Sequence, residues 1–355
     1  MWNKVTDTTL FCGISFSRPV EMCSWRLITD EGSSMKRRPF GAAGPTRRAA
    51  LLAALSLVCA RSAHAAGPTT RITLATATPG GGFPSFGDAF AAAIRAADPD
   101  LAVETQASGG SAENVRLLRA GRVDLALVQG EYAYPALADA GGLTVLTPMY
   151  PTPGLFAVPT ASPIRTVEDL RGRPVVLGTH NSGLTLMGRS ALKASGLDPE
   201  RDIRPVLLDR AGDGPSMVLD GRADALWGGG LAWPGFFAMA QAPGGARFFG
   251  PSEAGIARLA QAGGALQRLT VPPGSFLGQS AKIETVGSWS LVLARPGFEA
   301  DVAYRLVRAL ARADMAMRHP QGADGRPQNL SGLVPAAQIN PGTLCYLGET
   351  GTPVR

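Results

Sequence analysis

Two glycine-rich turns contain the residues of this chain that are best suited to holding a small ligand. The first turn spans residues 80–87 (GGGFPSFG), and the second spans residues 109–114 (GGSAEN). Each follows a short apolar run and precedes an alanine- and leucine-rich stretch with helical spacing. Such turns expose the unpaired N–H groups of a helix N-terminus, where the helix dipole favours a negative charge. The two turns therefore predict a site for a carboxylate or a similar anion.

A third turn of the same kind lies further along the chain. Residues 179–183 (THNSG) follow the predicted strand 175–178 and precede another helical pattern. Hydroxyl and N–H groups of this turn are expected to meet the ligand from the opposite side. His180 lies in the same turn, but neither an acid nor a thiol stands beside it. A structural or hydrogen-bonding role is therefore favoured over acid–base catalysis.

Several candidate side chains have a second, structural interpretation. Phe83 either stacks on an apolar part of the ligand or packs in the core, and Ser111 is predicted to cap the helix whose N–H groups form the anion site. Asn114 faces either the ligand or the solvent. Gln129 ends a predicted parallel strand, where the ligands of open α/β sheets bind. Trp233 either covers the ligand or is buried in the core.

Together the turns and strand ends define one predicted site. Its candidate ligand-binding residues are Gly81, Gly82, Phe83, Gly110, Ser111, Asn114, Gln129, Asn181, Ser182, Gly183, Thr185, Trp227 and Trp233. The sequence predicts no catalytic residue, no metal ligand and no cofactor.

Strands and helices alternate on both sides of these turns. In the first part of the chain the predicted strands are 72–77, 101–105 and 125–128, and the predicted helices are 84–97 and 112–120. In the second part the predicted strands are 175–178, 204–208, 223–227 and 247–249, and the predicted helices are 184–195 and 215–219. Alternation with short links predicts parallel sheets that are covered by helices on both faces.

Two further apolar segments are predicted to connect two lobes. Residues 155–158 form the first crossing and residues 288–294 the return crossing, after which a helix over 302–318 packs back onto the first lobe. The predicted fold class is an α/β, two-lobed periplasmic binding protein (type II-like), in which each lobe is a mostly parallel sheet flanked by helices. Lobe one comprises 66–157 with 286–355, and lobe two comprises 158–285. Two crossings leave a cleft that closes by a hinge motion.

The N-terminal region is typical of an export signal. A basic segment begins at residue 35, an apolar run follows over residues 49–60, and Ala63-His64-Ala65 forms a cleavage motif. Residues 35–65 are predicted to be a signal peptide that is cleaved near Ala65, by either the general or the twin-arginine export route. Residues 1–34 lack the alanine and glycine of the later chain, and we interpret them as an upstream extension from a mis-assigned start codon.

Removal of this leader changes the charge of the protein. Of the 34 Lys and Arg and the 28 Asp and Glu, 9 and 4 lie in residues 1–65, which leaves 25 basic and 24 acidic residues. Such a nearly neutral chain predicts no nucleic-acid partner. Cys345 is the only cysteine after residue 65, so the sequence predicts no intramolecular disulfide and no zinc or iron cluster.

The two N-terminal turns resemble those of the TAXI-type solute-binding subunits of tripartite (TRAP) transporters. That family has a Gly-Gly-Thr-Tyr-Tyr-Pro-hydrophobic-Gly turn that aligns with residues 80–87, and a Gly-Gly-Ser-x-x-Asn-hydrophobic-x-x-Leu pattern that aligns with residues 109–118. The similarity continues through 121–129, 168–173, 178–185, 220–225 and 341–346. The resemblance implies a periplasmic receptor for a glutamate-like or dicarboxylate ligand that works with TRAP membrane subunits.

The predicted function is that of an extracytoplasmic receptor, not an enzyme, which captures a small organic anion or amino acid and delivers it to a TRAP-type permease. An ABC-importer receptor of the thiamine-precursor or sulfonate kind is the alternative within binding proteins, and a periplasmic sensor that serves a kinase is a third. A nucleotide-dependent enzyme is the rival from another class, because Gly80 and Gly82 follow a strand and Glu104 ends the next one. The third glycine of that motif is replaced by Ser85.

Overall fold

The structure is a computed structural model that describes residues 69–313 and 318–354. The predicted upstream segment 1–34 and signal peptide 35–65 lie outside the described residues. Among the residues that are described, every helix is too short or too polar to cross a lipid bilayer.

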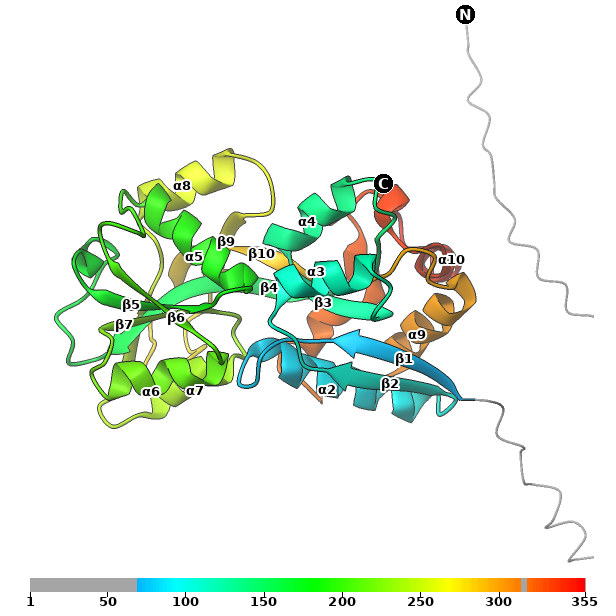
Figure 1. Cartoon of the computed structure of the whole chain (residues 1–355), viewed down its shortest axis with the longest axis horizontal. Helices are drawn as coiled ribbons and strands as arrows, with labels where there is room; N and C mark the ends of the chain where they lie inside the picture. Colours follow the sequence, from blue (N-terminus) through cyan, green and yellow to red (C-terminus); the bar gives the residue numbers. More distant parts are fainter. Residues whose placement is uncertain (1–68, 314–317, 355) are drawn as a thin grey trace, which may run out of the picture. The chain divides into compact units, whose positions relative to one another are not determined.

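Lobe one is built on a sheet of three parallel strands that is covered on both faces. Its strands are β1 (Thr70–Ala75), β2 (Leu101–Gln106) and β3 (Leu125–Gln129), with β1 in the middle. Helices α2 (Gly82–Ala97) and α9 (Ala300–Arg312) pack together on one face, and α3 (Ser111–Arg119) and α4 (Gly130–Ala138) lie on the other (Figure 1). The C-terminal helix α10 (Pro341–Glu349) packs against α9.

Lobe two repeats this arrangement with a second parallel sheet. Strand β5 (Pro174–Thr179) lies between β6 (Arg204–Leu208) and β7 (Ala225–Gly229). Helices α5 (Gly183–Ala194) and α8 (Glu253–Gln261) cover one face, and α6 (Gly214–Leu219) and α7 (Pro234–Gln241) cover the other. The short strand β8 (Ala246–Phe249) completes the lobe.

Two long antiparallel strands join the lobes. Strand β4 (Thr144–Pro159) pairs through its first half with β10 (Ile283–Ala294) and through its second half with β7 and β8. Strand β10 pairs with β9 (Gln267–Val271) before it reaches β4 and β3. The strand order β2-β1-β3-β10-β4-β7-β5-β6 therefore passes through both lobes, and β4 and β10 are the crossings about which a hinge motion would occur.

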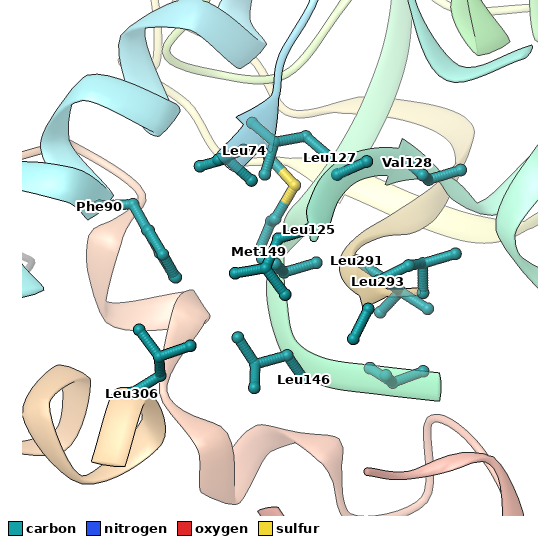
Figure 2. Packing of buried hydrophobic residues seen from close by; sticks show 14 of the residues in the cluster. Leu74, Phe90, Leu125, Leu127, Val128, Leu146, Met149, Leu291, Leu293 and Leu306 are labelled. Carbon is teal, nitrogen blue, oxygen red and sulfur yellow. The ribbon is translucent and has the colours of Figure 1, made fainter. Parts of the chain in front are cut away.

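Each lobe has its own hydrophobic core. Figure 2 shows the core of lobe one, where side chains from β1, β3 and β10 meet Phe90 of α2 and Leu306 of α9. Lobe two has two cores, one under α6 and α7 and one under α5. Strand β3 is buried at every position, as expected for a parallel strand that is covered on both faces.

Local sequence fixes the starts of several helices. The Ser182 hydroxyl accepts a hydrogen bond from Leu184 N at 3.1 Å at the start of α5, and the Ser252 hydroxyl accepts one from Gly255 N at the same distance at the start of α8. Asn340 Oδ1 accepts from Gly342 N at 2.9 Å at the start of α10. Such caps satisfy N–H groups that have no partner within the helix.

The predicted fold class is confirmed, because two α/β lobes with mixed sheets are joined by β4 and β10. Helix α9 follows the return crossing and packs on lobe one as predicted, although it ends at Arg312. Helices α4, α7, α8 and α10 and strand β9 were not predicted from the sequence. The short 3₁₀ helices Glu168–Leu170, Ala211–Asp213, Gly322–Gly325, Pro327–Leu330 and Ala336–Gln338 were not predicted either. The lobe boundaries 66–157, 158–285 and 286–355 stay a prediction.

Candidate functional site

A cavity of about 70 Å³ lies between the two lobes. It opens at the carboxyl ends of β1 and β3 on one side and of β5, β6 and β7 on the other, where ligands of open α/β sheets bind. Its lining residues are Ala77, Thr78, Gly81, Gly82, Phe83, Gly110, Ser111, Gln129, Val176, Leu177, Gly178, Thr179, Ser182, Leu184, Leu208, Ala211, Leu226, Trp227, Gly228 and Trp233.

The N-caps of helices from both lobes line this cavity. Among the described residues they are Gly81 of α2, Gly110 of α3, Gln129 of α4, Ser182 of α5 and Trp233 of α7. The first N–H groups of a helix have no partner within it, and each helix N-terminus carries about half a positive charge. Helix starts from both lobes therefore present partial positive charge to the same space.

Most of the predicted ligand-binding residues line this cavity. They are Gly81, Gly82, Phe83, Gly110, Ser111, Gln129, Ser182, Trp227 and Trp233. Phe83 fits both of its interpretations, because it lines the cavity and also packs against the core of lobe one. The Nε1 of Trp227 donates to the Leu184 carbonyl at 2.8 Å, so its ring is fixed within lobe two.

Four predicted residues lie outside the cavity lining. Asn114 is fully buried, and its Nδ2 donates to the carbonyls of Thr76 and Leu127, both at 2.7 Å. Thr185 is also buried, with Oγ1 at 2.7 Å from the Thr179 carbonyl. Both side chains hold strand ends together and are not placed to reach a ligand.

Asn181 and Gly183, the other two, lie where the lobes touch. The Asn181 carbonyl accepts a hydrogen bond from Ala112 N at 3.1 Å. A Cβ on Gly183 would stand 2.8 Å from Oε1 of Gln129, so lobe two approaches β3 closely at this point. His180 is exposed and does not line the cavity.

The prediction that Ser111 caps α3 is wrong. Gly110 is the N-cap of α3, and Ser111 is the first residue of the helix. Its hydroxyl accepts a hydrogen bond from Gln129 N at 3.1 Å. Gly110 has a φ of +118°, which an L-residue such as serine rarely adopts, so the cap falls to glycine and the hydroxyl is used to fix the end of β3.

A turn of lobe one contacts lobe two along one side of the cavity. Nε1 of Trp233 donates to the Gly80 carbonyl at 3.0 Å, and Ala211 N donates to the Thr78 hydroxyl at 3.2 Å. Gly212 N donates to the Pro79 carbonyl, also at 3.2 Å. Gly80 has a φ of +80°, and a Cβ there would lie 2.4 Å from the Cα of Gly212. Glycine is therefore required for the lobes to meet here.

Gln321 makes a further bridge near the crossing strands. Its Oε1 accepts from Ala232 N in lobe two at 3.1 Å, and its Nε2 donates to the Pro151 carbonyl in β4 at 3.3 Å. This bridge and the Ala112–Asn181 bond add to the hydrogen bonds that Trp233 and Ala211 make between the lobes. The arrangement is that of a closed cleft.

The lining of the cavity contains neutral side chains only, with no Asp, Glu, Lys, Arg or His among the described lining residues. Gln129 is nearly fully buried, and its Nε2 has no hydrogen-bond partner in the described part of the chain. This nitrogen is itself enclosed by protein atoms and is not exposed to the cavity. In residues 69–313 and 318–354 no cluster of His, Cys, Asp and Glu could hold a metal ion.

Glu131 is a half-buried acid next to this site that was not predicted from the sequence, and its carboxyl oxygen Oε1 is buried. Its Oε2 accepts from the Ser288 hydroxyl of β10 at 2.8 Å, and its Oε1 has no partner among the described residues. Burial raises the pKa of the Glu131 carboxyl to about 7, against weaker lowering effects of its own N–H, Ser288 and the Gln129 amide. The Gln129 amide faces Glu131, although no hydrogen bond with ordinary geometry joins them.

The apolar back wall of the cavity was also missed. Leu208 and Leu226 line it from β6 and β7, and Ala211 closes it from a 3₁₀ turn. Apolar strand residues give the same sequence pattern in a core and in a binding site, so the pattern does not reveal this wall. Only the position of Ala211 after a strand end could have indicated that it lies at a ligand site.

The rival interpretation as a nucleotide site is not favoured by the position of Glu104. This residue lies on β2, at the edge of the sheet, and its Oε1 pairs with Arg71 at 3.0 Å with both side chains exposed. It does not line the cavity. The described residues that line the cavity therefore include no acid that could bind a ribose.

The fold and the cavity define a two-lobed α/β protein of the periplasmic-binding-protein class. The chain belongs to the NMT1-like family, whose model matches residues 74–351.

Solved structures with a similar fold include several binding proteins. The alkanesulfonate-binding protein SsuA from Xanthomonas axonopodis pv. citri, bound to MOPS, is 16% identical over 79% of this chain and 84% of its own, with a TM-score of 0.44. SsuA from Escherichia coli is 19% identical over 80% and 79%, with a TM-score of 0.43. PhnD1 from Prochlorococcus marinus (MIT 9301), in complex with methylphosphonate, is 13% identical over 69% and 85%, with a TM-score of 0.47. At such low similarity none of them indicates the ligand of this chain.

Proposed function

We propose that this protein is an extracytoplasmic solute receptor that closes its two lobes over a small organic anion or amino acid. The observation that carries the proposal is the convergence of helix starts from both lobes on a cavity that lies between them. Neutral lining residues suit reversible binding, because they supply no nucleophile activated by a base and no general acid. The protein makes and breaks no covalent bond in this function.

Closure provides the mechanism of capture. A ligand that touches the α2 and α3 starts in lobe one and the α5 start in lobe two binds the closed form better than the open form. Such a ligand shifts the hinge equilibrium towards closure by its difference in affinity. The bonds from Trp233 to Gly80 and from Ala211 to Thr78 add contacts that exist only when the lobes meet.

The membrane partner is proposed from the sequence resemblance. The turns at residues 80–87 and 109–118 resemble those of TAXI subunits, which favours delivery to a TRAP-type permease from the periplasm after cleavage of the leader near Ala65. Delivery to an ABC importer is an equal alternative, because receptors for both transporters share the two-lobed fold. Gene neighbours distinguish the two, since an importer cassette encodes an ATPase and a TRAP cluster does not.

A thermal-shift panel tests the receptor function. The chain from Ala66 onward is heated with amino acids, mono-, di- and tricarboxylates, sulfonates and neutral heterocycles. A ligand at one hundred times its Kd is expected to stabilise the folded protein by about 2.7 kcal/mol and to raise the Tm.

The matched controls for the panel are two phenylalanine variants. Ala211→Phe fills the cavity and should abolish the shift, whereas Ala140→Phe in an exposed loop should keep it. An unchanged Tm across the whole panel, or an Ala211→Phe variant that responds like the wild type, would contradict the function.

A further inference from the structure

We infer that closure of the two lobes takes up one proton from the solvent and that Glu131, in the first turn of α4, holds it beside the hinge. The inference rests on the lobe closure of the proposed function, but the species that is bound is the proton, so no ligand is needed to test it. A closed form that holds a proton captures any ligand more strongly in mildly acidic than in alkaline solution.

Glu131 lies where both crossing strands meet the end of β3. Its Oε2 accepts a hydrogen bond from the Ser288 hydroxyl of β10 at 2.8 Å. Ser288 is paired in register with Thr152 of β4, whose hydroxyl lies 3.0 Å from that of Ser290. Ser290 is paired in turn with Gln129, the last residue of β3. The carboxyl therefore belongs to a polar cluster that includes both strands of the hinge.

Lobe two closes over this cluster at the start of α5. A Cβ on Gly183 of α5 would stand 2.8 Å from Oε1 of Gln129, so this face of the amide is covered by lobe two. The Gln129 amide also faces Glu131, and both its Nε2 and Oε1 of Glu131 are buried without a hydrogen-bond partner among the described residues. Helix α4 itself contacts α5. Withdrawal of α5 when the lobes open would therefore admit water to the amide and the carboxyl.

The closed hinge favours the neutral form of the Glu131 carboxyl. Burial raises its pKa from the ordinary 4.5 to about 7, against weaker lowering effects of its own N–H, Ser288 and the Gln129 amide. A proton on Oε2 can be donated to the Ser288 hydroxyl oxygen, which leaves Oε1 as an acceptor. Water that enters on opening lowers the pKa towards 4.5, and the proton is released. Because the closed form has the higher pKa, closure is favoured below about pH 7 and loses this contribution above it.

Burial, and not a neighbouring charge, sets the protonation of Glu131. On α4 itself, burial and the charge of Glu131 raise the pKa of Tyr134 to about 12, so this phenol stays neutral in the relevant range. Helix α4 packs against β3, β10, α3 and α5, and β3 has no charged residue. The titratable groups of the other three elements and of the turn before α5 do not contribute to the pKa of Glu131. They are Glu284 of β10, Glu113, Arg116 and Arg119 of α3, Arg189 and Lys193 of α5, and His180.

Single-molecule fluorescence energy transfer on the ligand-free chain from Ala66 onward tests the inference. Cys345 is the only cysteine after residue 65, so one dye on Cys345 in lobe one is paired with a second on Leu277→Cys, an exposed position of lobe two. The ratio of closed to open molecules should rise by up to about thirtyfold from pH 8.5 to pH 5.5, as follows from a pKa of about 7 when closed and 4.5 when open. In Glu131→Gln, which is always neutral, the ratio should be high at both pH values. An unchanged ratio in the wild type, or a wild-type response in Glu131→Gln, would overturn the inference.

Ser288→Ala gives a second readout that does not depend on the Glu131→Gln variant. The Ser288 hydroxyl lowers the pKa of Glu131, so its removal should move the midpoint of the pH response to a higher pH. A midpoint that stays in place or moves to a lower pH would contradict the role of Glu131. The proposed receptor function is tested separately, because a thermal-shift panel without a response would contradict that function, whereas ligand binding without any pH response of closure would overturn only the present inference.

Discussion

Nε1 of Trp233 in lobe two donates a hydrogen bond to the carbonyl of Gly80 in lobe one, 3.0 Å away. Both residues border the cavity, Trp233 as part of its lining and Gly80 next to the lining residue Gly81. The bond joins segments that are 153 residues apart in the chain. The bond exists only when the lobes meet, so closure of the cleft and the position of the Trp233 ring in the cavity lining depend on each other.

Trp233→Phe should shift the lobes towards the open form. The substitution removes one hydrogen bond, worth about 0.5–1.5 kcal/mol, from the closed form only, which corresponds to a roughly two- to tenfold loss of ligand affinity. Small-angle scattering should show a larger radius of gyration for the variant in the presence of ligand. Trp227→Phe is the matched control, because its Nε1 bond to Leu184 lies within lobe two, and both variants are measured at saturating ligand because Trp227 also lines the cavity. It should lower the Tm without opening the cleft, and an equal opening in both variants would refute the role of Trp233.

Gly80→Ala should prevent full closure. Its Cβ would lie 2.4 Å from the Cα of Gly212, and the positive φ is unfavourable for alanine. Gly121→Ala has a similar backbone cost at φ +62° but meets no atom within 4 Å. Both variants should lose about 1–2 kcal/mol of stability from the left-handed backbone, whereas only Gly80→Ala should bind ligand weakly in calorimetry. Wild-type affinity of Gly80→Ala would contradict the contact between the lobes.

Glu131 should make the stability of the protein depend on pH. Its pKa is about 7 in the folded protein and 4.5 as an ordinary carboxyl, so the folded state holds the proton more tightly. The stabilising contribution is complete below about pH 4.5, falls as the pH rises towards 7 and is lost above it, with a total change of up to about 3 kcal/mol. Chemical unfolding across this range measures the change.

Glu131→Gln isolates this titration. Glutamine keeps an acceptor for the Ser288 hydroxyl but does not ionise, so the variant should be more stable than the wild type at pH 8 and should lack its dependence between pH 4.5 and 7. Glu168→Gln, at an exposed position, is the control and should keep the wild-type profile. A wild-type profile in Glu131→Gln would show that another group is responsible.

Ser182→Ala should affect both stability and binding. It removes the cap of α5, which costs about 1 kcal/mol, and loosens a helix start that borders the cavity. Ser252→Ala removes the equivalent cap of α8, which lies away from the cavity. Equilibrium unfolding should show similar losses in the two variants, but only Ser182→Ala should weaken ligand binding. Equal ligand affinities of the two variants would show that the start of α5 is not part of the binding site.

The strand–turn–helix units could be predicted from the sequence because local signals determine them. Strands such as β3 are buried on both faces and therefore almost wholly apolar, and glycine or a capping serine is the N-cap of the helices that follow β1, β2 and β5. Helix α4 escaped notice because it begins directly after Gln129 and contains Pro135, which is a helix-breaking residue at an interior position. Because α4 was not predicted, Glu131, which lies in this helix, was not recognised as a residue near the site.

The roles of single polar residues were harder to predict. Asn114 and Thr185 stand one turn into helices that begin near the cavity, yet their side chains satisfy strand carbonyls instead. The contacts between the lobes depend on residues far apart in sequence, such as Gly80 and Gly212. No local pattern encodes the distance between two such positions.

A crystal structure of the protein grown with the tightest-binding compound of the panel tests the central claim most directly. The account predicts density for that compound between the lobes, with its acidic oxygens at the starts of α2, α3 and α5 and its carbon chain against Leu208 and Leu226. A compound bound elsewhere on the protein, or a complex in which the three helix starts face away from it, would contradict the account.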